Sequence, residues 1–294
     1  MYVTCFQVRY NSLIMWDQWQ GPATKRKLEE DDVHISKQSY QGDMTTASKK
    51  RLKKRLDVLL QLSPRHYETN PATMKRMMFQ LAFVTLTMSA DEIIDHKTAH
   101  SKCLSKFTRW LNTLKITYIW KAELQKSGQI HYHVVINKPV HHRAIRDKWN
   151  RFQDEAGYLI KYEEQNGHKD ANSTDVHAVA HVKDLHQYIS KYISKSNKCF
   201  IDDYENCDPS GIPSKKEVKI NGKVWDCSQA LKAIKMYQAE DDQDIWNEAG
   251  KYGEQKTLDQ CGIVLNVNPE SYLSKYHKAA YNKWKIENKQ SLIK

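Results

Sequence analysis

The stretch ITYIWKAELQKSGQIHYHVVIN, residues 116–137, contains the pattern that decides the fold. Two runs rich in β-branched and aromatic residues flank Lys126-Ser127-Gly128, and such runs around a short glycine-containing loop predict a β-hairpin. Gly128 can adopt the left-handed backbone conformation that a three-residue hairpin loop requires. We therefore expect two adjacent antiparallel strands, at 116–124 and 129–137.

The register of this hairpin brings together three side chains that could bind a metal. If Gln125 pairs with Gln129, Glu123 lies directly opposite His131, with Cβ atoms about 5 Å apart. His133 is two residues further along the strand and points to the same face, whereas the residues between them point to the core. Two imidazoles and a carboxylate suit a divalent cation and leave positions open for water or a phosphate oxygen. A histidine pair on a strand also occurs on ordinary polar faces, so the hairpin alone leaves both interpretations open.

A second pattern of chemical interest is YISKYISK, residues 188–195. On a helix, positions four apart share a face, so Tyr188 and Tyr192 point the same way with Lys191 and Lys195 beside them. A phenol has a pKa near 10, and attack on a phosphodiester requires its activation by a metal or a neighbouring cation. The alternative is an amphipathic helix with packed tyrosines and solvated lysines, which this segment alone favours.

The elements around these motifs predict an α+β fold. A single antiparallel sheet with helices packed on it follows from strands and helices in this order. We expect further strands at 81–88, 157–163 and 174–182, and helices at 97–114 and 141–154. Outside this region, we expect irregular structure over 1–47, a basic amphipathic helix over 48–62, a hairpin that turns at Asn221-Gly222, and helices near 228–240 and 270–287.

These elements suggest three consecutive segments. They are a basic, partly helical N-terminal extension (1–75), a central domain (76–198) and a mixed hairpin and helical C-terminal extension (199–294). The helix over 48–62 has two equally good interpretations: packing on the central domain with solvated lysines, or contact with a DNA backbone.

Composition narrows the classes of partner. The net charge of +11 on 294 residues favours a polyanion, because lysine and arginine release counterions when they bind phosphates. The six cysteines form no CxxC pair, which argues against a structural zinc site. No run of about 18 apolar residues and no secretory leader is present, so we expect a cytoplasmic protein without a membrane span. No GxxxxGK[ST] loop occurs, which argues against a fused helicase.

In combination, these motifs resemble those of the HUH endonuclease superfamily, named for two histidines that flank a bulky hydrophobic residue. The spacing E-x4-G-x2-H-x-H over 123–133 matches the metal motif, and YISKYISK matches the tyrosine motif. FVTLTMS, residues 83–89, resembles the first motif of the superfamily. The chain is most similar to the two-tyrosine rolling-circle replication initiators of small single-stranded-DNA phages, the microviruses. The resemblance covers about residues 80–197.

The resemblance implies a ferredoxin-like or RRM-like HUH core and a particular chemistry. His131, His133 and Glu123 would hold Mg²⁺ or Mn²⁺. Tyr188 or Tyr192 would attack single-stranded DNA at a replication origin, leaving a 5′-phosphotyrosine and a free 3′-OH. Lys191 and Lys195 would stabilise the phosphate or the phenolate. A host helicase and DNA polymerase are the implied partners, in a bacterial host cytoplasm, while the oligomeric state stays open.

Two other functions remain compatible with the sequence. A transposase or a plasmid relaxase shares the HUH core and its chemistry, and the paired tyrosines do not separate these classes. A non-catalytic module that binds single-stranded nucleic acid would instead present exposed aromatic residues on the sheet face.

Overall fold

The computed structural model describes most of the chain. The described residues are 2–9, 12–19, 44–69, 74–90, 92–179, 198–207, 213–240, 251, 254–258, 262–266 and 275–293. They belong to two compact units, each composed of separate stretches of the chain. The first unit contains 1–41, 60–62 and 233–291, and the second contains 42–59, 63–232 and 292–294. The boundaries expected after residues 75 and 198 stay a prediction.

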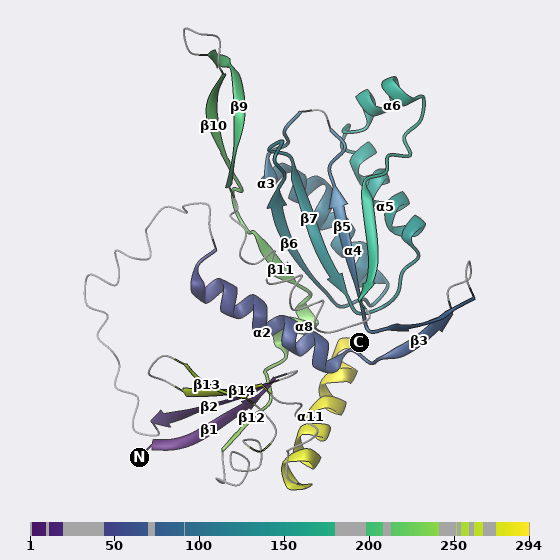
Figure 1. The fold of residues 1–294 in the computed structure, drawn as a ribbon. Coiled ribbons are helices and arrows are strands. Elements are labelled where there is room, and N and C mark those ends of the chain that lie inside the picture. The colour runs from purple at the N-terminus through teal and green to yellow at the C-terminus, as the bar shows by residue number, and fades with distance from the viewer. Residues whose placement is uncertain are drawn as a thin grey trace. The chain divides into compact units, whose positions relative to one another are not determined.

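The second unit contains a five-stranded sheet in which all neighbouring strands are antiparallel. Its order is β11-β6-β7-β5-β8, and Figure 1 shows helices of the same unit beside it. The strands are β5 (Leu81–Thr87), β6 (Tyr118–Leu124), β7 (Ile130–Ile136), β8 (Thr174–Val179) and β11 (Trp225–Cys227). The helices are α2 (Thr46–Leu62, whose last three residues are grouped with the first unit), α3 (His96–Ala99), the π-helical turn η1 (His100–Leu104), α4 (Ser105–Thr113), α5 (His142–Asp154), α6 (Ile160–Asn166) and α8 (Gln229–Ala233).

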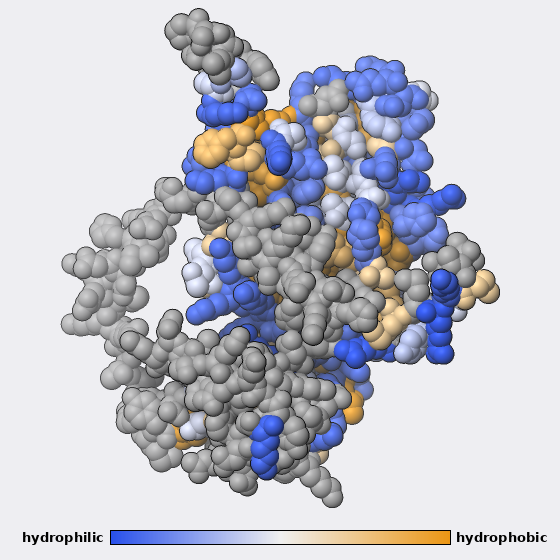
Figure 2. Space-filling view, viewed as in Figure 1, coloured by the Kyte–Doolittle hydropathy of each residue, from blue (hydrophilic) through white to orange (hydrophobic). Residues whose placement is uncertain are grey.

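The core of the second unit lies between one face of this sheet and the helices α4 and α5. Tyr132 and Val134 are fully buried on β7, as the alternation of side chains along a strand predicts. The indole of Trp149 on α5 packs edge-on against Phe107 of α4 and against Tyr132, with ring centroids 5.9 and 6.1 Å apart. Hydrophilic residues cover the visible surface of α5 and α6 (blue in Figure 2). The predicted α+β fold with helices packed on an antiparallel sheet is confirmed.

Most elements near the quoted hairpin agree with the sequence. Strands lie within the predicted ranges 81–88, 116–124 and 129–137, and β8 occupies the described part of the range 174–182. The predicted helices over 48–62, 97–114 and 141–154 are also present, the second as the continuous succession of α3, η1 and α4.

The strand predicted over 157–163 is wrong, because these residues begin helix α6 instead. The backbone N–H of Glu163 donates to the carbonyl of Leu159 at 2.9 Å, and that of Gly167 donates to Glu163 at 2.7 Å. Gly167 then ends the helix in the left-handed conformation, with φ of 74°. Short apolar runs fit either element, and here the local hydrogen bonds decide because β5 already pairs with β7 and β8.

The hairpin predicted at Asn221-Gly222 is also wrong. Gly222 has a φ of 99° as a turn requires, but the runs on its two sides join different sheets. The preceding strand β10 (Pro213–Lys219) pairs with β9 (Lys198–Cys207), whereas β11 pairs with β6. The following run therefore completes the edge of the main sheet instead of folding back locally. A further hairpin, β3 (His66–Thr69) with β4 (Arg76–Phe79), was not expected.

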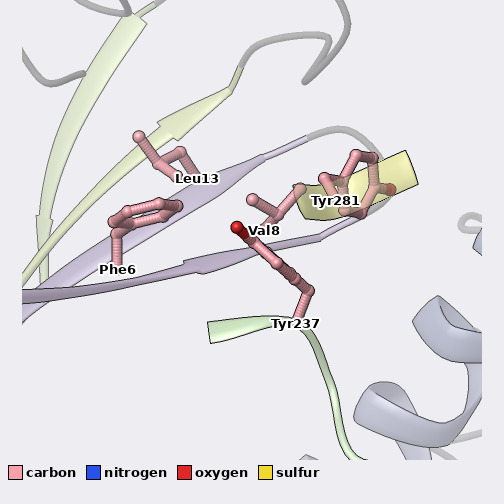
Figure 3. Packing of buried hydrophobic residues seen from close by; sticks show 5 residues of the cluster. All are labelled: Phe6, Val8, Leu13, Tyr237 and Tyr281. Atoms are coloured by element: carbon pink, nitrogen blue, oxygen red, sulfur yellow. The ribbon is translucent and has the colours of Figure 1, made fainter. Parts of the chain in front are cut away.

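The first unit corrects the expectation that residues 1–47 are irregular. Residues 2–19 form two paired strands within a sheet of order β12-β1-β2-β14-β13. Its strands are β1 (Tyr2–Val8), β2 (Leu13–Trp19), β12 (Gln238–Glu240), β13 (Glu254–Leu258) and β14 (Gly262–Asn266), and helix α11 (Lys275–Ile293) follows. Figure 3 shows the core, which contains Phe6, Val8, Leu13, Tyr237 and Tyr281. Its partners come from distant parts of the chain, so local pattern gave little indication of it.

The C-terminal helices agree with the sequence only in part. Helix α11 lies in the region where a helix was predicted near 270–287. The range 228–240 instead contains the short helix α8 followed by strand β12. Across the described part of the chain, no helix combines the length and the hydrophobicity that a membrane span needs.

Candidate metal centre

The loop between β6 and β7 has the predicted geometry. The N–H of Gln125 donates to the carbonyl of Gln129 at 2.9 Å, and the N–H of Gly128 donates to Gln125 at 3.0 Å. Gly128 has a φ of 83°, and a Cβ at this position would lie 2.8 Å from Cδ1 of Ile93. The position therefore favours glycine for its conformation and for its lack of space. The resulting register places Glu123 opposite His131, as predicted.

Three side chains converge on the face of the sheet opposite the aromatic core. The Nε2 atom of His133 lies 2.8 Å from Oε2 of Glu123. The rings of His131 and His133 are 4.7 Å apart between centroids, and one ligand atom from each of the three residues lies within 4.8 Å of the others. Glu123 and His133 are buried, and His131 is half-buried.

This group of donors fits a divalent cation. Two imidazoles and one carboxylate on one side of an ion form a facial arrangement that leaves other coordination positions open. Oxygen ligands from water or phosphate would complete the coordination that Mg²⁺ or Mn²⁺ prefers. The arrangement thus agrees with the ligand set expected from the sequence, while the binding of a metal stays a prediction.

Two neighbouring polar side chains contact the outer nitrogens of the histidines. The hydroxyl oxygen of Thr85 lies 3.3 Å from Nδ1 of His133, and the amide of Gln125 lies 3.2 Å from Nδ1 of His131. For a histidine to bind a cation through Nε2, its proton must lie on Nδ1, where an oxygen can accept it. Thr85 provides that oxygen directly, and Gln125 provides it when its amide oxygen faces the ring.

The same face carries a lysine that the sequence analysis missed. Lys121 lies directly opposite His133 and two residues before Glu123, so its side chain is on the face of the metal ligands. Only 5% of it is exposed, and its Nζ atom donates to the carbonyl of Ala122 at 3.3 Å. The register that predicted Glu123 opposite His131 would also have placed Lys121, because it shares the same alternation.

The tyrosine between the two histidines has a different role from the predicted nucleophiles. The hydroxyl of Tyr132 lies 3.3 Å from Nδ1 of His96. Burial raises the pKa of the Tyr132 phenol well above its ordinary value, and its ring packs in the aromatic core. Tyr132 is therefore a core residue. The predicted catalytic residues Tyr188, Lys191, Tyr192 and Lys195 lie outside the described residues.

Fold and site together define an α+β protein with a two-histidine, one-carboxylate cluster on a sheet face. A family model for replication-associated proteins of the ORF2 type matches residues 81–197. The matched segment contains β5 to β8 and all three residues of the cluster, and it supports a role as a replication initiator. No curated protein and no solved structure matches the chain.

Proposed function

We propose that this protein initiates rolling-circle replication by nicking single-stranded DNA at an origin through a tyrosine nucleophile. The observation that carries the proposal is the convergence of Glu123, His131 and His133 within the segment that matches a replication-associated family. Charge adds support, because a chain with a net charge of +11 favours a polyanionic partner.

The three clustered residues would hold Mg²⁺ or Mn²⁺. Such an ion polarises a phosphoryl oxygen and neutralises the charge that develops on it. The phenolic oxygen of Tyr188 or Tyr192 forms a bond to the phosphorus, and the bond from phosphorus to the 3′ oxygen of the preceding nucleotide breaks. That oxygen takes up a proton and becomes a free 3′-OH, while the DNA stays attached through a 5′-phosphotyrosine. Lys191 and Lys195 stabilise the negative charge on phosphate or phenolate.

Two tyrosines four residues apart allow the reaction to be repeated. A host polymerase extends the free 3′-OH, with a host helicase separating the strands ahead of it. The second tyrosine then cleaves the regenerated origin, and the new 3′-OH attacks the first phosphotyrosine to close a circle. Each step exchanges one phosphodiester for another, so no nucleotide hydrolysis is needed. This cycle is that of the two-tyrosine phage initiators that the sequence resembles.

The test is a nicking assay on single-stranded oligonucleotides that tile the origin of the replicon encoding the protein, with Mn²⁺ and with or without chelator. We expect a covalent protein–DNA adduct that the chelator abolishes. Tyr188→Phe and Tyr192→Phe should each retain an adduct, and the double variant should lose it. Tyr162→Phe, on helix α6, is the matched control and should behave as the unaltered protein.

Two outcomes would contradict the proposal. An adduct that persists in the double variant would place the nucleophile elsewhere. Tight binding of every oligonucleotide without any adduct would favour the non-catalytic single-strand-binding module. Strand transfer between unlinked DNA sites, rather than circle closure, would instead favour a transposase with the same chemistry.

A further inference from the structure

Helix α2 has two chemically distinct sides. Leu52, Leu56 and Leu59 are buried on one side. The other side carries positive charge in its first half, with Lys49-Lys50-Arg51 and Lys53-Lys54. All of these cations except the half-buried Lys49 are exposed. The part of α2 that is visible in Figure 2 is mainly blue.

The positive charges on this side of α2 have no partners of opposite charge among the residues that the structure describes. Elsewhere on the second unit, several surface cations are paired: Lys106 with Glu155, Lys169 with Asp154, and Lys223 with Asp226. The first turn of α2 contains no acidic residue. Cations near a helix N-terminus are disfavoured by the helix dipole, so this arrangement works against the stability of the helix. A polyanion bound there would compensate both effects.

Hydrogen bonds connect this basic side to the face of the metal cluster. The indole N–H of Trp225 donates to Oγ of Ser48, at the start of α2, at 2.7 Å. Trp225 lies opposite Lys121, which lies opposite His133, so the three residues form one row across β11, β6 and β7. A second contact, from Nη1 of Arg55 to the carbonyl of Leu231 at 3.0 Å, fixes the following turns of α2 to α8. The basic side therefore begins where the row of site residues ends.

We propose that the basic side of α2, residues 49–54, binds the phosphate backbone of the DNA strand whose scissile phosphate enters the metal centre. This inference rests on the proposed function and adds a second contact region, outside the segment that the family model matches. Single-stranded DNA is favoured over an anionic membrane because the apolar side of α2 is buried in the protein. A helix that lies in a membrane interface needs that apolar side for the lipid.

The test compares two variants that each lose three positive charges. The first is Lys50→Gln/Lys53→Gln/Lys54→Gln. The matched control is Lys97→Gln/Lys102→Gln/Arg109→Gln, which changes exposed cations on the helices α3, η1 and α4. Both variants are made in the full chain with Tyr188→Phe/Tyr192→Phe, so that binding is measured without cleavage. Fluorescence anisotropy gives the affinity for an origin oligonucleotide at several salt concentrations.

We expect the α2 variant to bind more weakly and to have a shallower salt dependence. Each lost phosphate contact reduces the slope of log affinity against log salt by about 0.7 for a single strand, so three contacts reduce it by about 2. The control should keep the slope of its parent. Circular dichroism melting of both variants establishes that the fold is retained, and Lys→Arg changes at the same α2 positions should restore the slope.

Three results would overturn the inference. They are an equal loss of slope in both variants, no loss in the α2 variant, and loss of binding to phosphatidylserine vesicles with DNA binding unchanged. The last would assign the basic side to a membrane. Because binding is measured in a cleavage-deficient chain, failure of the α2 contact is distinguishable from failure of the nicking chemistry, which the adduct assay measures separately.

Discussion

At the scale of single residues, the candidate site depends on which imidazole nitrogen carries the proton. Thr85 is the clearest positioning residue, because its hydroxyl lies beside Nδ1 of His133 on the side away from Glu123. A hydroxyl that accepts the Nδ1 proton keeps Nε2 available as a ligand. Partners of this kind typically contribute about 10-fold to 100-fold to metal affinity.

Thr85→Val should therefore weaken Mn²⁺ binding by about 10-fold or more, because valine has nearly the same shape but cannot accept the proton. Isothermal titration calorimetry with Mn²⁺ measures the change. Thr87→Val is the matched control: Thr87 is on the same strand, opposite His131, and its loss should leave the affinity near that of the unaltered protein. Equal weakening by both changes would contradict a specific role for Thr85.

The sequence predicted the ligands but not their surroundings. Glu123 and His131 could be paired because one glycine loop sets the register of a local hairpin. The position of Thr85 opposite His133 depends on how β5 pairs with β7, and residues 81–88 are separated from the hairpin by a predicted helix. Lys121 was passed over because a lysine in a strand is usually solvated, whereas here it is buried.

At the scale of elements, the β6–β7 hairpin positions the cluster, and Gly128 is its most sensitive point. Gly128→Ala should lower the free energy of unfolding by more than the roughly 1–3 kcal/mol that a disfavoured backbone conformation costs. The reason is that a Cβ would also meet Cδ1 of Ile93 at 2.8 Å and Cγ2 of Ile201 at 3.1 Å. Urea denaturation measures the change.

Gly222→Ala provides the control for this experiment. Gly222 also has a positive φ, of 99°, but a Cβ there would have no neighbour within 4 Å. Its substitution should cost only the conformational part. If the two substitutions destabilise the protein equally, close packing around Gly128 does not contribute.

Elements were predictable where their partners are near in sequence or where their apolar pattern is long. Strands β5, β6 and β7 and helix α5 meet one or both conditions. The strand expected over 157–163 and the hairpin expected at Asn221-Gly222 failed because the outcome depends on which strands already occupy each edge of the sheet. Strand β11 pairs with β6, about 100 residues earlier in the chain, and no local pattern indicates such a pairing.

At the scale of the whole molecule, a bound cation should stabilise the folded chain. A ligand that binds only the folded state adds about 2.7 kcal/mol at a concentration about 100 times its dissociation constant. The melting temperature should therefore rise with Mn²⁺ and return to its starting value with chelator, as measured by differential scanning fluorimetry. His131→Ala should abolish the rise, whereas His168→Ala, which changes an exposed histidine, should preserve it. A rise that survives His131→Ala would move the metal elsewhere.

The two units differ in how soon their strands become available during synthesis. The second unit has its complete main sheet once residue 227 has left the ribosome, whereas β1 must wait for β12, and β2 for β14, which ends at Asn266. The first strands to be made are thus among the last to be completed. Until then, the nascent chain carries Phe6, Val8 and Leu13 without the tyrosines that cover them in the finished fold. A chaperone that shields such early apolar strands would assist production of this protein more than faster translation would.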